Sequence, residues 1–313
     1  MSEHPVRAEP VEALRGSHTS TSSVQTGAVL ALTVNAFVWG TSWWPFRYFQ
    51  SHGLHPLWAT ALIYGTAVLV ILVARPRSLL QLARSPSLWV LVLAAGTTNA
   101  SFNWGVVVGD VVRVLLLFYL MPLWAVLLAR VLLNEPITPH ASARVLLALA
   151  GAAIVLWPAG GAGLPLPSTL PDWLGVLGGF SFALNNVMLR REAAQPAEGR
   201  ALAMFGGGAL VSLVIASVLA THGSAPWPPA PQPAWFGLAA LMVLLFLVGN
   251  LALQYGASRL RASVTAVVML TEIVFGAVSS LALGAGVLTV PLVLGGALIL
   301  LAALLSAFGP AAH

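Results

Sequence analysis

The chain has 313 residues, of which 58% are hydrophobic and only 7% are charged, and its mean hydropathy is +0.91. A water-soluble domain carries about 25% charged residues, so the composition excludes a soluble globular protein and requires lipid as part of the solvent. Cysteine is absent, which excludes disulfide scaffolds and thiolate metal sites.

Residues 1–26 are polar and rich in Ser and Thr, and we expect a disordered cytoplasmic tail there because the segment has little apolar surface to bury. Long apolar runs then alternate with short polar breaks. A spanning helix needs about 20 residues, and the runs are too long and too uniformly apolar for strands. We therefore predict an all-α integral membrane protein with ten transmembrane helices, near 27–46, 56–74, 87–107, 111–133, 141–158, 172–190, 200–220, 234–256, 262–283 and 287–308.

The arginines predict the orientation of these helices. All 14 basic residues are Arg, and with the N-terminus inside, only Arg47 and Arg113 fall on the outer side. Basic residues accumulate on the cytoplasmic side of membrane proteins. We expect a multi-pass protein of the cell (inner) membrane with both termini in the cytoplasm. The sequence pI of about 10.7 then reflects topology, and no nucleic-acid partner is expected.

Two stretches of the chain resemble each other at a shift of 151 residues: 99–105 (NASFNWG) and 250–256 (NLALQYG) match amide, amide, aromatic and glycine in order. Near the start of each half the shift is 143, which pairs Trp39 with Phe182. Five spans per half is an odd number, so the second copy is inverted in the membrane, as in many secondary transporters. We predict a first five-helix repeat at 27–158 and a second, inverted one at 159–313.

Four short motifs add to this layout: WGTS at 39–42, MPLW at 121–124, NEPIT at 134–138 and LTEIVF at 270–275. With the ten-helix arrangement, they resemble the EamA-type members of the drug/metabolite transporter superfamily over about residues 27–308. The chain departs from the family pattern at Ile273, where the family has Pro, and at Ala285-Gly286, where a second Gly-Glu would stand. The resemblance implies transport, most often export, of amino acids or related metabolites.

Glu272 is the one acid that the prediction places near the middle of a span. A charged side chain there costs about 2.5–3.5 kcal/mol on insertion scales, so it is protonated, paired or in contact with water. Our hypothesis is that Glu272 lines a central cavity and binds a proton or a cationic group of the substrate. The alternative is a structural acid that hydrogen-bonds a neighbouring helix.

Buried amides form a second set of candidates. Asn99 and Asn103 share one helix face at i and i+4, as do Asn250 and Gln254 in the second half. Inside lipid such groups need protein, water or ligand as partners. They either face the substrate pathway or make interhelical hydrogen bonds. Weaker candidates of the same kind are Asn35, Asn185 and Asn186.

Among the aromatic residues, Trp39 and Tyr119 are the preferred candidates for a cavity lining because their spans carry the family-like motifs; the alternative is packing or anchoring at the membrane surface. Pro122 lacks an N–H and is expected to kink its helix, as a gate hinge or as a fixed bend. Asp110 is expected to cap the next helix and to pair with Arg113.

These features together predict a secondary transporter that moves a small organic metabolite, an amino acid or a related compound, by alternating access. No phosphate-binding Gly-x-x-x-x-Gly-Lys loop is present, so a proton or counter-solute gradient is expected to supply the energy. No cofactor and no metal site are expected. The alternatives are an exporter of hydrophobic cations, drugs or lipids, and an intramembrane enzyme.

Overall fold

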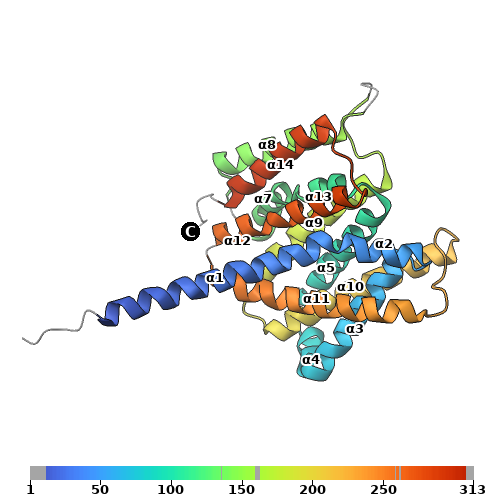
Figure 1. Cartoon of the computed structure of the whole chain (residues 1–313), viewed down its shortest axis with the longest axis horizontal. Coiled ribbons are helices and arrows are strands. Elements are labelled where there is room, and N and C mark those ends of the chain that lie inside the picture. The colour runs from blue at the N-terminus through green and yellow to red at the C-terminus, as the bar shows by residue number, and fades with distance from the viewer. Residues whose placement is uncertain (1–11, 135, 159–162, 258, 261, 308–313) are drawn as a thin grey trace, which may run out of the picture.

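The computed structural model describes residues 12–134, 136–158, 163–257, 259–260 and 262–307, and all regular elements within these ranges are helices. Most of these helices lie alongside one another in a single bundle (Figure 1). In chain order they are α1 (Glu12–Thr41), α2 (Trp43–Ser51), α3 (Pro56–Ala74), α4 (Arg77–Arg84), α5 (Pro86–Val108), α6 (Val111–Phe118), α7 (Met121–Leu132), α8 (Pro139–Leu156), α9 (Leu170–Arg191), α10 (Ala197–Thr221), α11 (Pro233–Ala257), α12 (Ala262–Met269), α13 (Thr271–Ala282) and α14 (Val290–Ala307).

Each predicted span coincides with one of these helices or with two consecutive ones, α1 with α2, α6 with α7 and α12 with α13. In the described part of the chain, seven helical stretches are long and apolar enough to cross a membrane. The apolar stretches 267–282 and 290–305 are shorter, and α9 is made more polar by Asp172, Arg190 and Arg191. That all ten predicted segments cross the membrane stays a prediction.

Two helical segments were not predicted. The helix α4 lies in a stretch assigned to a loop, because eight residues flanked by arginines are too short to register as a span. The helix α1 begins at Glu12, so residues 12–26 of the predicted tail are helical. This stretch has no proline to stop the helix from continuing outward from the apolar part of α1. Residues 1–11 of the predicted tail lie outside the described residues.

The fourth and ninth predicted spans are each broken near their middle. Helix α6 ends at Phe118 and α7 begins at Met121, with Pro122 in the first turn, so regular helix is interrupted beside the proline at which a kink is expected. Helix α12 ends at Met269 and α13 begins at Thr271, although no proline stands there. At both breaks the hydrogen bonds change to the tighter i to i+3 spacing, as from Leu120 N to Leu117 O and from Leu270 N to Val267 O.

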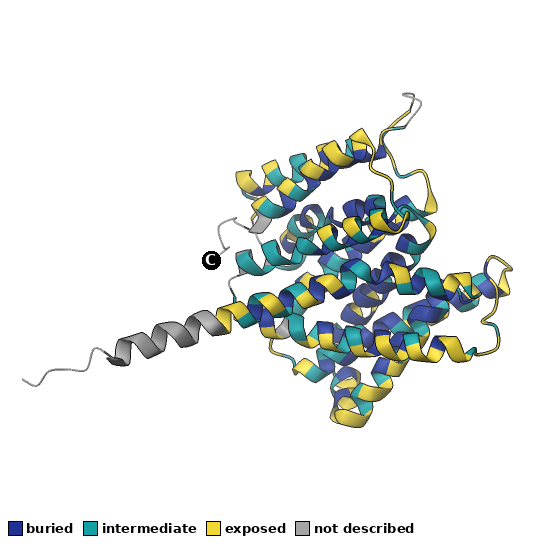
Figure 2. Ribbon diagram, viewed as in Figure 1, coloured by how far each residue is buried: buried dark blue, intermediate teal, exposed yellow. Residues whose placement is uncertain are grey.

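Most exposed apolar side chains face outward from the bundle, and its interior is buried (Figure 2). Val73, Leu69 and Leu146 are 86%, 64% and 67% exposed, which is normal for side chains that face lipid. Helix α5 contributes the largest share of buried residues among the candidate spans and packs against both α9 and α10. The centre of the bundle therefore lies around α5.

Glycines bring helix backbones into direct contact. A Cβ atom on Gly151 of α8 would lie 2.6 Å from the carbonyl oxygen of Gly295 of α14, and a Cβ atom on Gly295 would lie 2.6 Å from the carbonyl oxygen of Gly151. Lipid provides no hydrophobic force between helices, so close packing of small residues supplies much of the attraction. The pair α8 and α14 is thus held by a reciprocal glycine contact.

Gly151→Val is expected to lower the free energy of unfolding by about 1–3 kcal/mol, because its side chain would push α14 away from α8. Thermal unfolding in detergent, followed by circular dichroism, measures the effect. Gly206→Ala on α10 is the control, since a Cβ atom there meets no atom within 4 Å. The control is expected to melt at or above the wild-type temperature, because alanine favours a helix. Equal melting of Gly151→Val and wild type would contradict this packing account.

Candidate functional site

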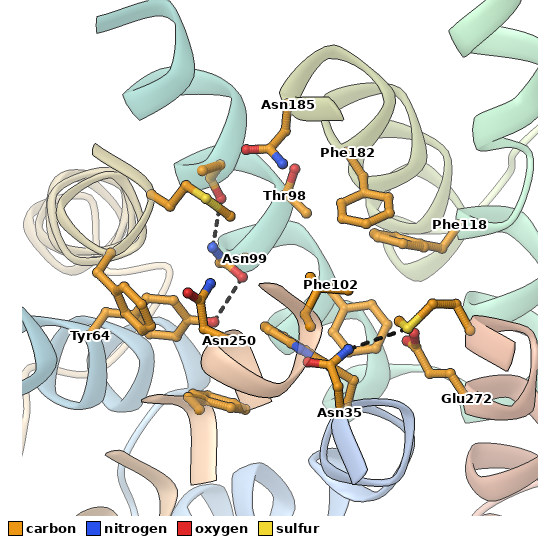
Figure 3. A pocket seen from close by; sticks show the side chains of 17 residues that line it. Asn35, Tyr64, Thr98, Asn99, Phe102, Phe118, Phe182, Asn185, Asn250 and Glu272 are labelled. Carbon is orange, nitrogen blue, oxygen red and sulfur yellow. Dashed lines mark hydrogen bonds between the residues drawn. The ribbon is translucent and has the colours of Figure 1, made fainter. Parts of the chain in front are cut away.

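A cavity lies at the centre of the bundle, with helices from both halves of the chain around it (Figure 3). Its free volume is about 100 Å³. The lining residues are Asn35 and Trp39 from α1, Tyr64 from α3, Ala95, Thr98, Asn99 and Phe102 from α5, Phe118 from α6, Phe182 and Asn185 from α9, Met204 and Phe205 from α10, Phe246, Asn250 and Leu253 from α11, Met269 from α12, and Glu272 from α13.

Glu272 lines this cavity and is buried, with 8% of its surface exposed. It stands in the first turn of α13, where the free N–H groups and the helix dipole favour a negative charge. The backbone of α1 comes directly against it: a Cβ atom on Gly40 would lie 2.5 Å from the Glu272 carbonyl oxygen. The glycine of the WGTS motif therefore permits the close approach of α1 to the turn that carries the acid.

Tyr119 is the hydrogen-bond partner of the Glu272 carboxyl group, at 3.2 Å from its Oη to Oε2. The same hydroxyl lies 3.2 Å from the carbonyl oxygen of Met269, the last residue of α12. A phenol has one proton and can donate to only one of these acceptors at a time. Tyr119 itself stands at the break between α6 and α7, so the two broken helices meet at their breaks through this side chain.

Of the four amide residues predicted to face the pathway, two lie together at the cavity. Asn99 and Asn250 both line the cavity. Asn99 accepts a hydrogen bond from the Tyr64 hydroxyl at 2.8 Å, and its Nδ2 donates to the Ala95 carbonyl oxygen at 2.8 Å. Asn103 does not line the cavity: it is fully buried and donates to Thr60 Oγ1 at 3.2 Å, between α5 and α3. Gln254 is in α11, but its side chain lies outside the described residues.

Asn35 and Asn185 line the cavity as well, and they are 1% and 2% exposed. The Oδ1 atom of each is buried and has no hydrogen-bond partner among the described residues. The Nδ2 of Asn35 points to the Met269 sulfur, at 3.5 Å. Buried polar atoms normally have partners, so these two oxygens offer free acceptor positions at the cavity.

Aromatic rings form much of the remaining wall. Trp39 stacks on Phe246 with centroids 4.8 Å apart, and Phe102 stands edge-on to Trp39 at 6.2 Å. Sequence reasoning selected Trp39 but not Phe102, Phe246 or Phe205, because a phenylalanine in an apolar run carries no signal of which face it occupies. The repeat alignment did offer one signal, since it paired Phe182 with Trp39.

One end of the bundle, where α5 ends and α6 begins, is closed by an ion pair that joins the two halves; we refer to it as the Arg113 end. Arg113 Nε lies 2.6 Å from Asp172 Oδ1, and its Nη2 lies 3.2 Å from Asp172 Oδ2, a two-bond geometry. Asp110 caps α6 as predicted, by accepting from the Arg113 backbone N–H at 2.9 Å. The predicted side-chain pairing of Asp110 with Arg113 is wrong, because the guanidinium group turns to Asp172.

Two further hydrogen bonds link the halves at the Arg113 end. The Val287 N–H donates to Asp110 Oδ2 at 2.8 Å, and Trp43 Nε1 donates to Ser279 Oγ at 2.9 Å. Together with the ion pair, they tie α2 and α6 to the second half of the chain. Within the described residues, no group of three or more His, Asp and Glu side chains is placed to hold a metal ion.

Comparison with known proteins agrees with this architecture. Residues 26–157 match the model of the EamA-like transporter family. A chain of known structure, titled "Crystal structure of protein", is 21% identical, with a TM-score of 0.55 over 89% of this chain and 94% of that chain. At this identity the likeness shows the fold alone. No curated protein sequence matches significantly.

The family match covers nearly all of the first predicted repeat, and it confirms the resemblance to the drug/metabolite transporter superfamily that the motifs indicated. Residues 26–157 thus match the EamA-like transporter family, whose members are membrane transporters of small molecules.

Proposed function

We propose that the chain is a secondary transporter that moves a small organic metabolite by alternating access, with ten transmembrane helices arranged as two inverted five-helix repeats, 27–158 and 159–313. The observation that carries the proposal is the position of Glu272. This acid lines a cavity between the two halves, and its hydrogen-bond partner, Tyr119, comes from the other half. Ionisable groups inside a membrane bundle mark pathways for ions or substrates.

The element bounds support the repeat. A shift of 151 residues moves α6 (Val111–Phe118) onto the bounds of α12 (Ala262–Met269), and it moves α8 (Pro139–Leu156) onto those of α14 (Val290–Ala307). Helix α7 and helix α13 follow the two breaks at nearly the same shift and have equal lengths of 12 residues. Two unrelated halves would have no reason to break and restart at matching positions.

The packing pairs support a twofold relation between the halves. The repeat pairs α1 with α9, α3 with α10, α5 with α11 and α8 with α14. A twofold axis would then exchange the helix pair α5–α9 with the helix pair α11–α1. Both of these helix pairs are in contact. The pairs α3–α10 and α8–α14 map onto themselves and are also in contact.

Alternating access also requires a conformation that is closed at one end. In the predicted orientation, with both termini in the cytoplasm of the cell (inner) membrane, the Arg113 end is the outer one. It is tied by the Arg113–Asp172 ion pair. The cavity extends away from this end: Asn185 stands in the last two turns of α9, and Met204 stands in the second turn of α10. The tie at the outer end and the extension of the cavity toward the inner end both support an inward-facing state.

Glu272 and Tyr119 provide a means of coupling transport to a proton or to a charged solute. When the carboxyl group is ionised, Tyr119 donates its proton to Glu272. When it is neutral, Glu272 can donate to the tyrosine oxygen, and Tyr119 can donate to the Met269 carbonyl oxygen at the end of α12. Charge at Glu272 would thereby change a hydrogen bond at the break of the ninth span. Pro122, at the opposite break, remains the proposed hinge.

For the solute, an amino acid or a related compound moved outward is the first candidate, as the family resemblance implies. Hydrophobic cations, drugs or lipids are the second, favoured by the aromatic lining and the acid. An intramembrane enzyme has less support: among the residues that line the cavity, Glu272 is the single carboxyl group, and a general acid and a general base are both needed.

Glu272→Gln is expected to abolish coupled transport, because the amide cannot take up or release a proton and does not attract a cation. Proteoliposomes that contain a pH-sensitive dye report protein-dependent proton movement when a mixture of amino acids and amines is added. Glu192→Gln, in the loop after α9, is the matched control and is expected to behave as wild type. Proton movement by Glu272→Gln at the wild-type rate would exclude this role.

Tyr119→Phe is expected to reduce the same transport signal about tenfold or more, since a hydrogen bond to a charged group contributes about 1.5–3 kcal/mol. The loss should be larger at the alkaline end of the pH profile, where the lost bond is to the ionised carboxylate. The measurement is the transport rate as a function of pH. A uniform loss at every pH would point to a packing role for the ring and not to the hydroxyl.

The double variant Arg113→Gln/Asp172→Asn is expected to open the Arg113 end more often, because it keeps the shape of the pair and removes its charges. The native chain has no cysteine, so Val106→Cys, a fully buried probe near this end, reports access to a membrane-impermeant maleimide. Labelling should accelerate severalfold in the double variant. Ser224→Cys, in an exposed loop, should label equally in both backgrounds. An unchanged labelling rate of the Val106→Cys probe would argue against a gate here.

A further inference from the structure

The polar groups of the cavity include hydrogen-bond acceptors that no protein group satisfies. Glu272 supplies a carboxyl group, and Asn35 and Asn185 supply two buried oxygens that lack partners among the described residues. Two of the amide donors already have partners: Asn99 Nδ2 donates to the Ala95 carbonyl oxygen, and Asn35 Nδ2 points to the Met269 sulfur. A ligand that completes this site therefore has to bring N–H or O–H groups.

The charge of the residues that line the cavity also favours a ligand that carries N–H groups. The residues that line it include one acid and no Arg, Lys or His. A carboxylate placed in this apolar space would have no cation to pair with, and an unpaired buried charge is costly. An ammonium group, in contrast, would find the Glu272 carboxylate as its counter-ion and the amide oxygens as acceptors.

The remaining wall fits an apolar body. Figure 3 shows Glu272 and Asn35 on one side, Asn99 and Asn250 on the other, and the ring of Phe102 between them. The faces of aromatic rings such as Trp39 also attract cations. The free volume of about 100 Å³ is below the 300–1,000 Å³ common for ligand pockets, so the fit is to a small solute.

We infer that the solute is a small primary or secondary organic ammonium ion with an aromatic or other apolar body and no carboxylate. The inference rests on the proposed transport function and deepens it, because it chooses between the candidate solutes named above. It favours amines over amino acids, whose carboxylate has no cationic partner among the residues that line the cavity. It also favours them over quaternary cations, which have no N–H to give to Asn35 and Asn185.

Four probes with the same phenyl body separate these cases: 2-phenylethylamine, its N,N,N-trimethyl derivative, phenylalanine and 3-phenylpropanoate. Isothermal titration of the detergent-purified chain measures each Kd. We expect 2-phenylethylamine to bind at least tenfold more tightly than each of the other three. Equal or tighter binding of phenylalanine or 3-phenylpropanoate would overturn the inference, as would the absence of 2-phenylethylamine binding up to 10 mM, roughly the limit of weak specific association.

Variants connect the binding to the named atoms. Glu272→Gln and Asn185→Leu are each expected to raise the Kd of 2-phenylethylamine at least fivefold. Asn186→Leu is the matched control: this neighbouring residue is exposed and does not line the cavity, and its Kd is expected to equal that of wild type. An equal change in Kd for Asn185→Leu and Asn186→Leu would show that the Asn185 amide oxygen does not bind the ligand.

Transport in proteoliposomes distinguishes this inference from the proposed function. If 2-phenylethylamine binds as expected but is not moved across the membrane, the ligand class stands and the transport proposal fails. If phenylalanine is bound more tightly and moved while 2-phenylethylamine is not, transport stands and the inferred ligand class is wrong.

Discussion

A carboxyl group inside a lipid-embedded helix bundle has to be neutral, paired or hydrated, and the surroundings of Glu272 are arranged around this constraint. The break before α13 gives the acid the free N–H groups of a helix start. The break between α6 and α7 places Tyr119 within hydrogen-bond distance. Irregular backbone is tolerated at membrane depth only where it is buried in protein or lines a cavity, and here both breaks meet at the same cavity.

The bundle combines two kinds of contact with different consequences for motion. Glycine contacts such as Gly151 with Gly295 bring backbones together over short distances, and they cannot be loosened without losing much of their van der Waals energy. The ion pair of Arg113 with Asp172 depends on two side chains that can find water as an alternative partner. The first kind suits units that stay intact, and the second suits an end that opens and closes.

The cavity holds acceptors that no protein donor satisfies, and a buried polar atom without a partner needs one from a ligand or from water. Asn103 donates to Thr60 Oγ1, but its Oδ1 also has no partner among the described residues, and it lies away from the cavity. Asn35 and Asn185 place their unpaired oxygens at the cavity itself, which they share with the only carboxyl group among the lining residues. The distinction between these amides lies in their neighbours, since all three are buried to a similar degree.

The sequence by itself determined the membrane class, the positions of the long apolar helices, the disturbance at Pro122 and the presence of an acid, Glu272, within an apolar run. Apolar run length, a missing N–H and an acid in an apolar run are local properties. Only the tertiary structure decided that Arg113 pairs with Asp172, that Asn103 turns away from the cavity, and that Phe102 and Phe246 line it. These outcomes depend on how each helix is rotated against its neighbours, and in a helix that is apolar on every side no periodic pattern encodes that rotation.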